Sequence, residues 1–282
     1  MEIDLAYEEL ELKACDGSSL FARHWRPSEA KAAVCLIHGM GEHSGRYQHV
    51  ARKLAGAGYA VLSYDQRGHG LSPGKRGDAP SLAEMAGDTA ALIELAGDYH
   101  SGLPRFLYGH SMGGNVAFSC VLRLQPDIDG LILTSPWLRL AFDPPPVKVW
   151  VGKGLARLWP SLSLSTGLKD ADLFHEADEK LEPDPLGHNR ISARFYFALQ
   201  KEGEWLLANY DRLHTPLLLM HGTGDNITSF MASRQLASGL GERCTFIPWR
   251  EGYHELHNDR DQEQVLEHII GWLDGIERKT AL

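Results

Sequence analysis

Short, nearly continuous apolar runs alternate with longer segments of helical periodicity along most of this sequence. A run of about five apolar residues is typical of a strand that is covered on both faces of a parallel sheet. We expect strands over 21–25, 32–37, 59–64, 106–110, 131–134, 217–221 and 245–248, and helices over 47–57, 82–99, 112–123, 231–240 and 261–278. This alternation predicts an α/β fold with a mostly parallel, doubly wound sheet and helices on both of its faces.

The alternation is interrupted between Trp137 and about Leu206. Asp143 is followed there by three prolines, which can continue neither a strand nor a helix. After them an apolar stripe recurs at helical spacing, formed by Val147, Val151, Leu155 and Leu158 with Trp150 and Trp159 beside it. We interpret residues 137–206 as an inserted cap over one end of the sheet, carried by a core of residues 1–136 and 207–282. The periodicity fits equally well a set of helices that simply cover a face of the sheet.

Charge and cysteine usage narrow the classes of function. The chain has 28 basic and 37 acidic residues and a formal net charge of −9, which disfavours nucleic-acid binding because that needs a basic face. Its four cysteines lie far apart without a C-x-x-C pair, so we expect neither a metal site nor a disulfide framework. The acidic start lacks the features of a secretory signal, and no run approaches the ~20 apolar residues that cross a bilayer. These features predict a cytoplasmic protein.

The segment Gly109-His110-Ser111-Met112-Gly113 matches G-x-S-x-G between an expected strand and an expected helix. In that context the motif is typical of a nucleophile elbow, a turn so sharp that its serine is strained and projects its side chain. We expect glycine at 109 and 113 because a β-carbon at either position would collide across the turn. The N-terminus of the following helix directs free N–H groups at this point and favours an anion there. Ser111 is therefore predicted to be a nucleophile.

A serine hydroxyl is a weak nucleophile at neutral pH and needs a base that is itself oriented by an acid. After this kind of elbow the acid and then the base follow the serine along the chain. Asp225 lies just past a late core strand, whereas Asp211 precedes that strand. His254 follows the next strand just after the turn at Gly252, which selects it over His257. We predict Asp225 as the acid and His254 as the base.

Acyl transfer passes through an oxyanion, which needs hydrogen-bond donors that are fixed in advance. The backbone N–H of Met112, the residue after the nucleophile, is one expected donor. The other is expected in a loop after an early strand, and the glycines of Ile37-His38-Gly39-Met40-Gly41 would leave the N–H of Met40 free to donate. The alternative is a glycine-rich turn without this role.

The stretch His38-Gly39-Met40-Gly41-Glu42-His43-Ser44-Gly45-Arg46-Tyr47 resembles the signature of the monoacylglycerol lipase and lysophospholipase branch of the α/β-hydrolases. Residues 65–72, 109–114, 184–186, 222–225 and 252–257 agree with it, so the resemblance covers nearly the whole core and is weakest in the insertion. It implies a sheet of about eight strands, a mobile cap lining an acyl pocket, and hydrolysis of a lipid ester without a cofactor. It places polar groups near the glycerol moiety at Glu42, Arg46 and His257, each of which could equally brace the oxyanion loop.

Together these features predict a serine hydrolase that cleaves monoacylglycerols to fatty acid and glycerol through an acyl-enzyme. The alternatives are a lysophospholipase, a short-chain carboxylesterase, or a non-catalytic binding protein on the same fold. Proline iminopeptidases carry a different glycine pattern in the oxyanion loop, so peptidase activity is not favoured. The apolar stripe at 147–158 could line an acyl channel or make transient contact with a membrane or micelle, with Lys148, Lys153 and Arg157 near anionic head groups. It could equally pack on the core.

Overall fold

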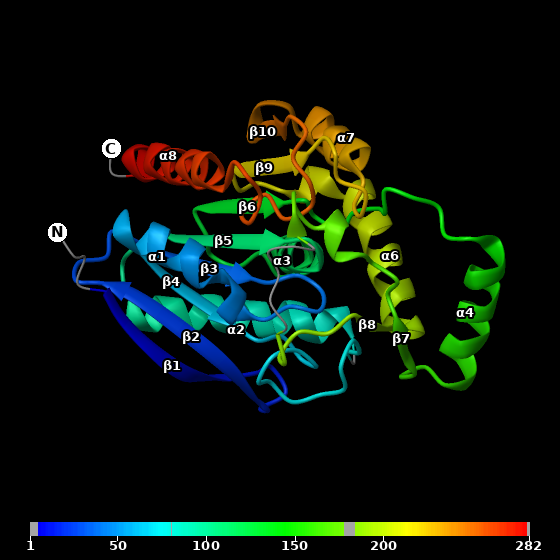
Figure 1. Ribbon diagram of the computed structural model, residues 1–282. Helices are drawn as coiled ribbons and strands as arrows, with labels where there is room; N and C mark the ends of the chain where they lie inside the picture. The colour runs from blue at the N-terminus through cyan, green and yellow to red at the C-terminus, as the bar shows by residue number, and fades with distance from the viewer. Residues whose placement is uncertain (1–4, 80, 178–183, 281–282) are drawn as a thin grey trace.

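The computed structural model describes residues 5–79, 81–177 and 184–280. An eight-stranded sheet runs through it in the order β1-β2-β4-β3-β5-β6-β9-β10 (Figure 1). Its strands are β1 (Leu5–Lys13), β2 (Ser19–Pro27), β3 (Ala32–Ile37), β4 (Tyr59–Tyr64), β5 (Arg105–His110), β6 (Gly130–Thr134), β9 (Leu217–Gly222) and β10 (Cys244–Trp249). Strand β2 is antiparallel to β1 and β4, and the other pairs are parallel. The predicted α/β fold with a mostly parallel sheet is confirmed.

Strand β1 is an edge strand that the sequence analysis did not predict. Its sequence, Leu5–Lys13, is rich in glutamate, and Leu12 is its one buried residue. It pairs with β2 in register over its full length. Charged residues on an edge strand discourage pairing with another chain. Because they stand where apolar residues would otherwise alternate, the pattern that predicts a strand is absent.

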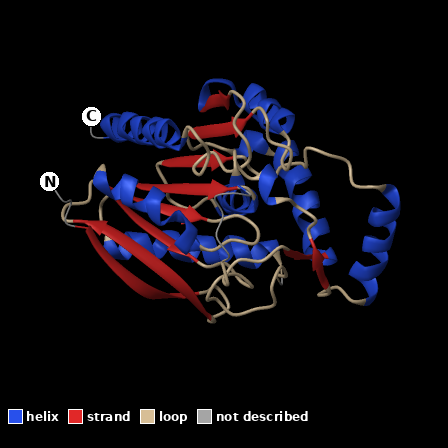
Figure 2. Ribbon diagram, in the orientation of Figure 1, coloured by secondary structure: helices blue, strands red, loops and turns tan. Residues whose placement is uncertain are grey.

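Helices cover both faces of the sheet, as Figure 2 shows. Helices α1 (Gln48–Gly56) and α8 (Gln262–Thr280) pack on one face and share a buried cluster with the strands. Helices α2 (Leu82–Tyr99), α3 (Met112–Leu124) and α7 (Phe230–Leu240) contribute to the cluster on the other face. The central strands β3, β4, β6 and β9 are buried along their whole length, which explains why their sequences are continuous apolar runs.

Residues 137–206 hold the elements α4 (Pro146–Leu158), β7 (Ser163–Ser165), β8 (Arg190–Ser192) and most of α6 (Ala193–Ala208). Helix α6 lies against α3, where Glu202 accepts hydrogen bonds from Ser119 and Arg123. Strands β7 and β8 form a separate two-stranded sheet. Helix α4 packs against α6 and lies at the far end of the molecule from the two termini (Figure 1).

The apolar stripe on α4 faces outward. None of the side chains of α4 is buried, and Val147, Trp150 and Leu158 are 73, 78 and 71% exposed. Leu155 is partly buried. The interpretation that this stripe packs on the core is therefore wrong. Within the described residues no helix combines the length and the apolar character needed to cross a membrane.

Candidate active site

Ser111 occupies the turn between β5 and α3, with φ 53° and ψ −119°. A non-glycine residue rarely adopts this conformation, which costs on the order of 1–3 kcal/mol and persists only where the surroundings enforce it. A β-carbon at Gly109 would lie 2.5 Å from the carbonyl oxygen of Gly113, across the turn as predicted. A β-carbon at Gly113 would instead meet the carbonyl oxygen of Ile37 at 2.2 Å. The expected collision across the turn is therefore wrong for Gly113. Glycine is needed there because a β-carbon would collide with the backbone of the neighbouring strand β3.

Three predicted residues form one hydrogen-bonded row. The Oγ of Ser111 lies 2.9 Å from Nε2 of His254, and Nδ1 of His254 lies 2.8 Å from Oδ2 of Asp225. The three residues are only 6, 4 and 7% exposed. They follow the carboxyl ends of β5, β10 and β9, so the parallel sheet brings together positions that are far apart in the sequence.

The Asp225 carboxylate is held from both sides. Its Oδ1 accepts hydrogen bonds from the backbone N–H groups of Ile227 at 2.7 Å and Thr228 at 3.0 Å, and its Oδ2 accepts one from the Thr228 hydroxyl at 2.8 Å. Nε2 of His221 lies 3.1 Å from the same Oδ2. Burial raises the pKa of Asp225, but His254 and His221 outweigh burial and hold this pKa well below its ordinary value. The group is an anion that accepts a hydrogen bond from the Nδ1–H of His254.

This arrangement fixes the state of His254. Because Nδ1 donates to Asp225, Nε2 presents its lone pair to the hydroxyl of Ser111. Burial lowers the pKa of His254, whereas the charge and hydrogen bond of Asp225 raise it, and the net shift is upward from 6.5. A base of this kind can take the proton of Ser111 and later return it to a leaving group.

The oxyanion loop lies directly against Ser111. A β-carbon at Gly39 would be 3.3 Å from Cβ of Ser111, so the loop backbone passes beside the nucleophile. Among the described residues, the backbone N–H groups of Met40 and Met112 have no hydrogen-bond partner. The N–H of Gly39 donates to Oε1 of Glu42 at 2.8 Å, which ties the loop to the next turn. This geometry leaves two backbone donors near the serine.

Of the three polar residues implied by the resemblance, Glu42 and Arg46 form polar contacts, whereas His257 packs among aromatic rings. Oε1 of Glu42 accepts from the Tyr47 hydroxyl at 3.2 Å as well as from the loop, and burial raises the pKa of Glu42 to about 7 against the opposing effect of Arg46. Arg46 donates to Glu255 at 2.8 Å. His257 is fully buried and stacks on Tyr47, with ring centroids 4.7 Å apart. Glu42 thus braces the oxyanion loop.

His110 lies between His257 and the hydrogen-bonded row of Ser111, His254 and Asp225. Its ring centroid lies 4.9 Å from that of His254 and 4.8 Å from that of His257. Sequence reasoning gave no role to His110, Thr228 or His221. Thr228 follows Asp225 by three residues, but that spacing by itself is not a signal of a supporting hydrogen bond.

Two adjoining cavities lie on this side of the molecule, and Ser111 lines the narrower one. A narrow cavity of about 90 Å³, here called the serine cavity, is lined mainly by apolar side chains from the loops around Ser111 and from residues 137–196. Its walls are Met40, Glu42, Ser111, Trp137, Leu140, Phe142, Thr166, Leu168, Leu173, Ile191, Tyr196, Ile227, His254 and Glu255. A more open cavity of about 390 Å³ adjoins it and shares Met40, Thr166, Leu168, Leu173 and Glu255. It is more polar than the serine cavity and is called the polar cavity below. Arg46, Lys169 and Asp184 bring charge to the polar cavity, whereas His257 lines neither.

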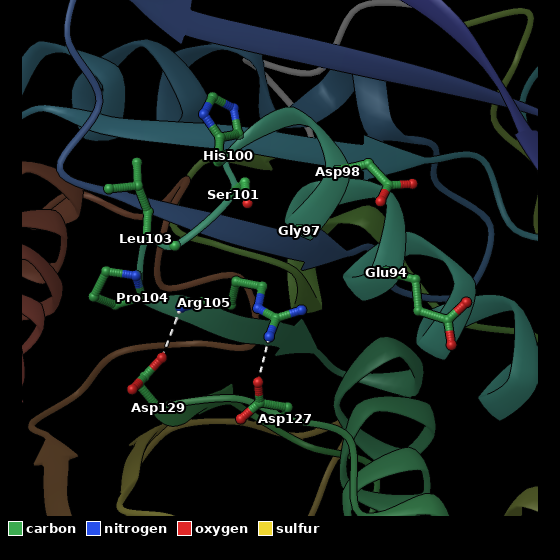
Figure 3. Close-up of a pocket in the computed structure, with 11 residues that line it drawn as sticks. Glu94, Gly97, Asp98, His100, Ser101, Leu103, Pro104, Arg105, Asp127 and Asp129 are labelled. Atoms are coloured by element: carbon green, nitrogen blue, oxygen red, sulfur yellow. Dashed lines mark hydrogen bonds and ion pairs between the residues drawn. The ribbon is translucent and has the colours of Figure 1, made fainter.

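A larger hollow of about 530 Å³ lies elsewhere, around the start of β5 and the end of α2 (Figure 3). Arg105 lies there between two aspartates: its side chain pairs with Asp127, and its backbone N–H donates to Asp129. This hollow is at the amino end of the parallel strands. Ligands of open α/β sheets bind at the carboxyl ends, where Ser111 lies.

Several known proteins are similar to this chain over most of its length. A family model described as "Serine aminopeptidase, S33" matches residues 28–261. An uncharacterised abhydrolase-domain protein of Dictyostelium discoideum is 35% identical over 272 residues, and the match covers 93% of this chain but only 28% of that protein. A monoacylglycerol lipase of Mycolicibacterium smegmatis is 32% identical over 255 residues, covering 88% of this chain and 90% of that protein.

The crystal structure of a monoacylglycerol lipase from Paleococcus ferrophilus superposes with a TM-score of 0.83 at 33% identity, covering 92% of this chain and all of that one. The resemblance to the monoacylglycerol lipase branch and the predicted α/β-hydrolase fold are both confirmed. This chain belongs to the serine aminopeptidase S33 family of α/β-hydrolases.

Proposed function

We propose that this protein hydrolyses the carboxylic ester of monoacylglycerols, with Ser111, His254 and Asp225 as its catalytic triad. The observation that carries the proposal is the hydrogen-bonded row of these three residues, of which Ser111 and His254 line a narrow apolar cavity that adjoins a more polar one. An ester that joins a fatty acyl chain to a small polar alcohol matches both cavities at once. Similarity to monoacylglycerol lipases over most of the chain points to the same substrate class.

The mechanism follows from the two hydrogen bonds of His254. Ser111 attacks the ester carbonyl while Nε2 of His254 takes its proton, and Asp225 stabilises the imidazolium that forms. The backbone N–H groups of Met40 and Met112 stabilise the oxyanion. His254 then protonates the leaving alcohol. A water molecule repeats the sequence on the acyl-enzyme and releases the fatty acid.

The two cavities differ in polarity, as do the two ends of the substrate. We place the acyl chain in the serine cavity, because its walls are mostly apolar. The glycerol moiety then faces the polar cavity, where Arg46 lies on the wall, whereas Glu42 lines the serine cavity. His257, buried behind His110, would act on the substrate only through its neighbours.

Covalent labelling and a substrate panel test the proposal together. A fluorophosphonate probe should label the wild-type protein and not Ser111→Ala. The panel compares monoacylglycerols with diacylglycerols, lysophospholipids and short aryl esters, and monoacylglycerols should have the highest kcat/KM. A higher kcat/KM for lysophospholipids would replace the substrate class and keep the mechanism, whereas an unlabelled wild type would refute the mechanism itself.

We further propose that residues 137–206 act as a cap and that α4 contacts a lipid surface. Val147, Trp150 and Leu158 share the outer face of this helix and are exposed. Lys148, Lys153 and Arg157 flank that face, so cations would lie near anionic head groups when the apolar face enters the interface. Because a monoacylglycerol resides in membranes or micelles, contact with a lipid surface would bring the protein to its substrate.

Vesicle co-sedimentation tests this contact. The inactive Ser111→Ala protein should bind phosphatidylcholine vesicles more strongly when phosphatidylglycerol is included. The added change Trp150→Asp should abolish binding, whereas Leu124→Asp, at an exposed leucine on the C-terminal end of α3, should leave it unchanged. Equal binding by both variants would refute the role of α4. A cytoplasmic location stays a prediction of the sequence, which cell fractionation tests.

A further inference from the structure

A third cavity lies beneath α4, beyond the serine cavity as seen from Ser111. This distal cavity measures about 220 Å³ and is lined by α4, α6 and the loop that precedes α4. It shares part of its wall with the serine cavity, namely Leu140, Phe142, Thr166, Ile191 and Tyr196. Four of these five side chains are apolar or aromatic. The apolar surroundings that begin at the nucleophile therefore continue under the helix.

Gly152 lies on the wall of this distal cavity, in the interior of α4. Glycine is a poor helix former, and at this position the missing side chain leaves room on the cavity wall. A β-carbon at Gly152 would lie 3.4 Å from Cε2 and Cζ of Phe197, which lines the same cavity. An alanine would thus just touch Phe197, and any larger side chain would have to occupy the cavity.

Gly154, two residues further along the same helix, provides the comparison. A β-carbon there would meet nothing within 4 Å. The two glycines have the same cost for the helix, but only Gly152 leaves space that another molecule could fill.

We propose that the distal cavity receives the methyl end of a long acyl chain, and that Gly152 sets the longest chain that the protein accepts. The inference rests on the proposed function, in which an acyl ester enters the serine cavity. A short acyl group would end within the serine cavity and would not reach α4. A long chain would pass between Leu140 and Tyr196 and lie against the bare backbone of Gly152.

The test is the acyl-chain profile of Gly152→Leu. We would measure kcat/KM for p-nitrophenyl butyrate, octanoate and palmitate, and for the matching monoacylglycerols. The leucine should lower kcat/KM for palmitoyl esters by at least about tenfold, since the loss of room for a single methylene in an apolar pocket already has an effect of this size. The butyryl ester should be cleaved as well as by the wild type.

The matched control is Gly154→Leu, which changes the helix in the same way without entering the cavity and should keep the wild-type profile. Adding Phe197→Ala to Gly152→Leu should restore cleavage of the palmitoyl esters, because it returns the space that the leucine takes. Thermal unfolding confirms that each variant is folded, and Gly152→Ala serves as a milder second variant that should change the profile little.

An unchanged profile in folded Gly152→Leu would overturn the proposal, as would the same shift in Gly154→Leu. Failure of the proposed function has a different signature. In that case the wild type would cleave the p-nitrophenyl esters but none of the monoacylglycerols, and the chain-length effect of Gly152→Leu would still be measurable on the aryl series.

Discussion

Replacing Asp225 by asparagine changes one atom in the catalytic row and should remove most of the activity. Oδ1 of Asp225 accepts two backbone N–H groups, from Ile227 and Thr228, while Oδ2 faces His254. An asparagine has a single carbonyl oxygen. Turning its NH₂ group toward the two N–H donors would leave these donors unsatisfied, at about 1–3 kcal/mol for each. The amide oxygen will therefore face the backbone and the NH₂ group will face His254.

That orientation reverses the tautomer of His254. With an NH₂ donor opposite, Nδ1 must accept a hydrogen bond and the ring proton moves to Nε2, which faces Ser111. A protonated Nε2 cannot take the serine proton. The same change in a protease triad lowers kcat by about 10⁴-fold, which corresponds to about 5 kcal/mol of transition-state stabilisation. We expect a loss of this size for Asp225→Asn.

The assay is kcat/KM on p-nitrophenyl butyrate, with thermal unfolding as a check of the fold. The control is Asp211→Asn, an exposed aspartate before β9 that should keep wild-type activity. Wild-type kcat/KM should also fall as the pH decreases through a pKa above 6.5, because His254 must be neutral to act as a base. A folded Asp225→Asn protein that loses less than tenfold, or a larger loss in Asp211→Asn, would refute the assignment.

Three further predictions concern the hydrogen-bonded row, the oxyanion loop and a pair of buried histidines. Ser111→Ala and His254→Ala should each lower kcat by several orders of magnitude, and the double variant by little more, since the two groups act in one step; additive losses in steady-state kinetics would contradict this. Glu42→Ala removes an acceptor that holds the oxyanion loop and should lower kcat by about 10²-fold, whereas Glu42→Gln keeps a carbonyl oxygen and should lose far less; equal losses would exclude a bracing role. Burial lowers the pKa of both His24 and His100, the latter to about 4. The Nε2 atoms of the two rings lie 2.9 Å apart. The unfolded chain therefore binds more protons below pH 6.5, so the urea midpoint should decrease from pH 7 to pH 5 and change less in His100→Asn; a midpoint independent of pH would contradict this.

The order of elements was predictable because each central strand is buried on both faces. Burial on both faces requires a run of apolar residues, as in Ala32–Ile37 and Tyr59–Tyr64. The structure has strands with these same bounds. The edge strand Leu5–Lys13 has one buried side chain and carries no such pattern. It becomes a strand because β2 supplies its hydrogen-bond partners.

Local geometry also made Ser111 recognisable. A sharp turn from strand to helix excludes a β-carbon at Gly109, and this exclusion is visible as glycine in the sequence. Asp225 and His254 could be chosen from fourteen histidines and many aspartates only because strand ends at one edge of a parallel sheet must meet. The sequence thus determined which residues can take part in the row.

Tertiary structure alone decided what surrounds that row. His221 and Thr228 lie 3.1 and 2.8 Å from Oδ2 of Asp225, and no spacing in the sequence encodes these contacts. The sequence also did not show which face of α4 would be buried. This helix is apolar on several sides, so its periodicity is the same whichever side meets the core. Only packing against α6 turns Gly152 toward a cavity and Trp150 toward solvent, because burial depends on what the other segments of the chain cover.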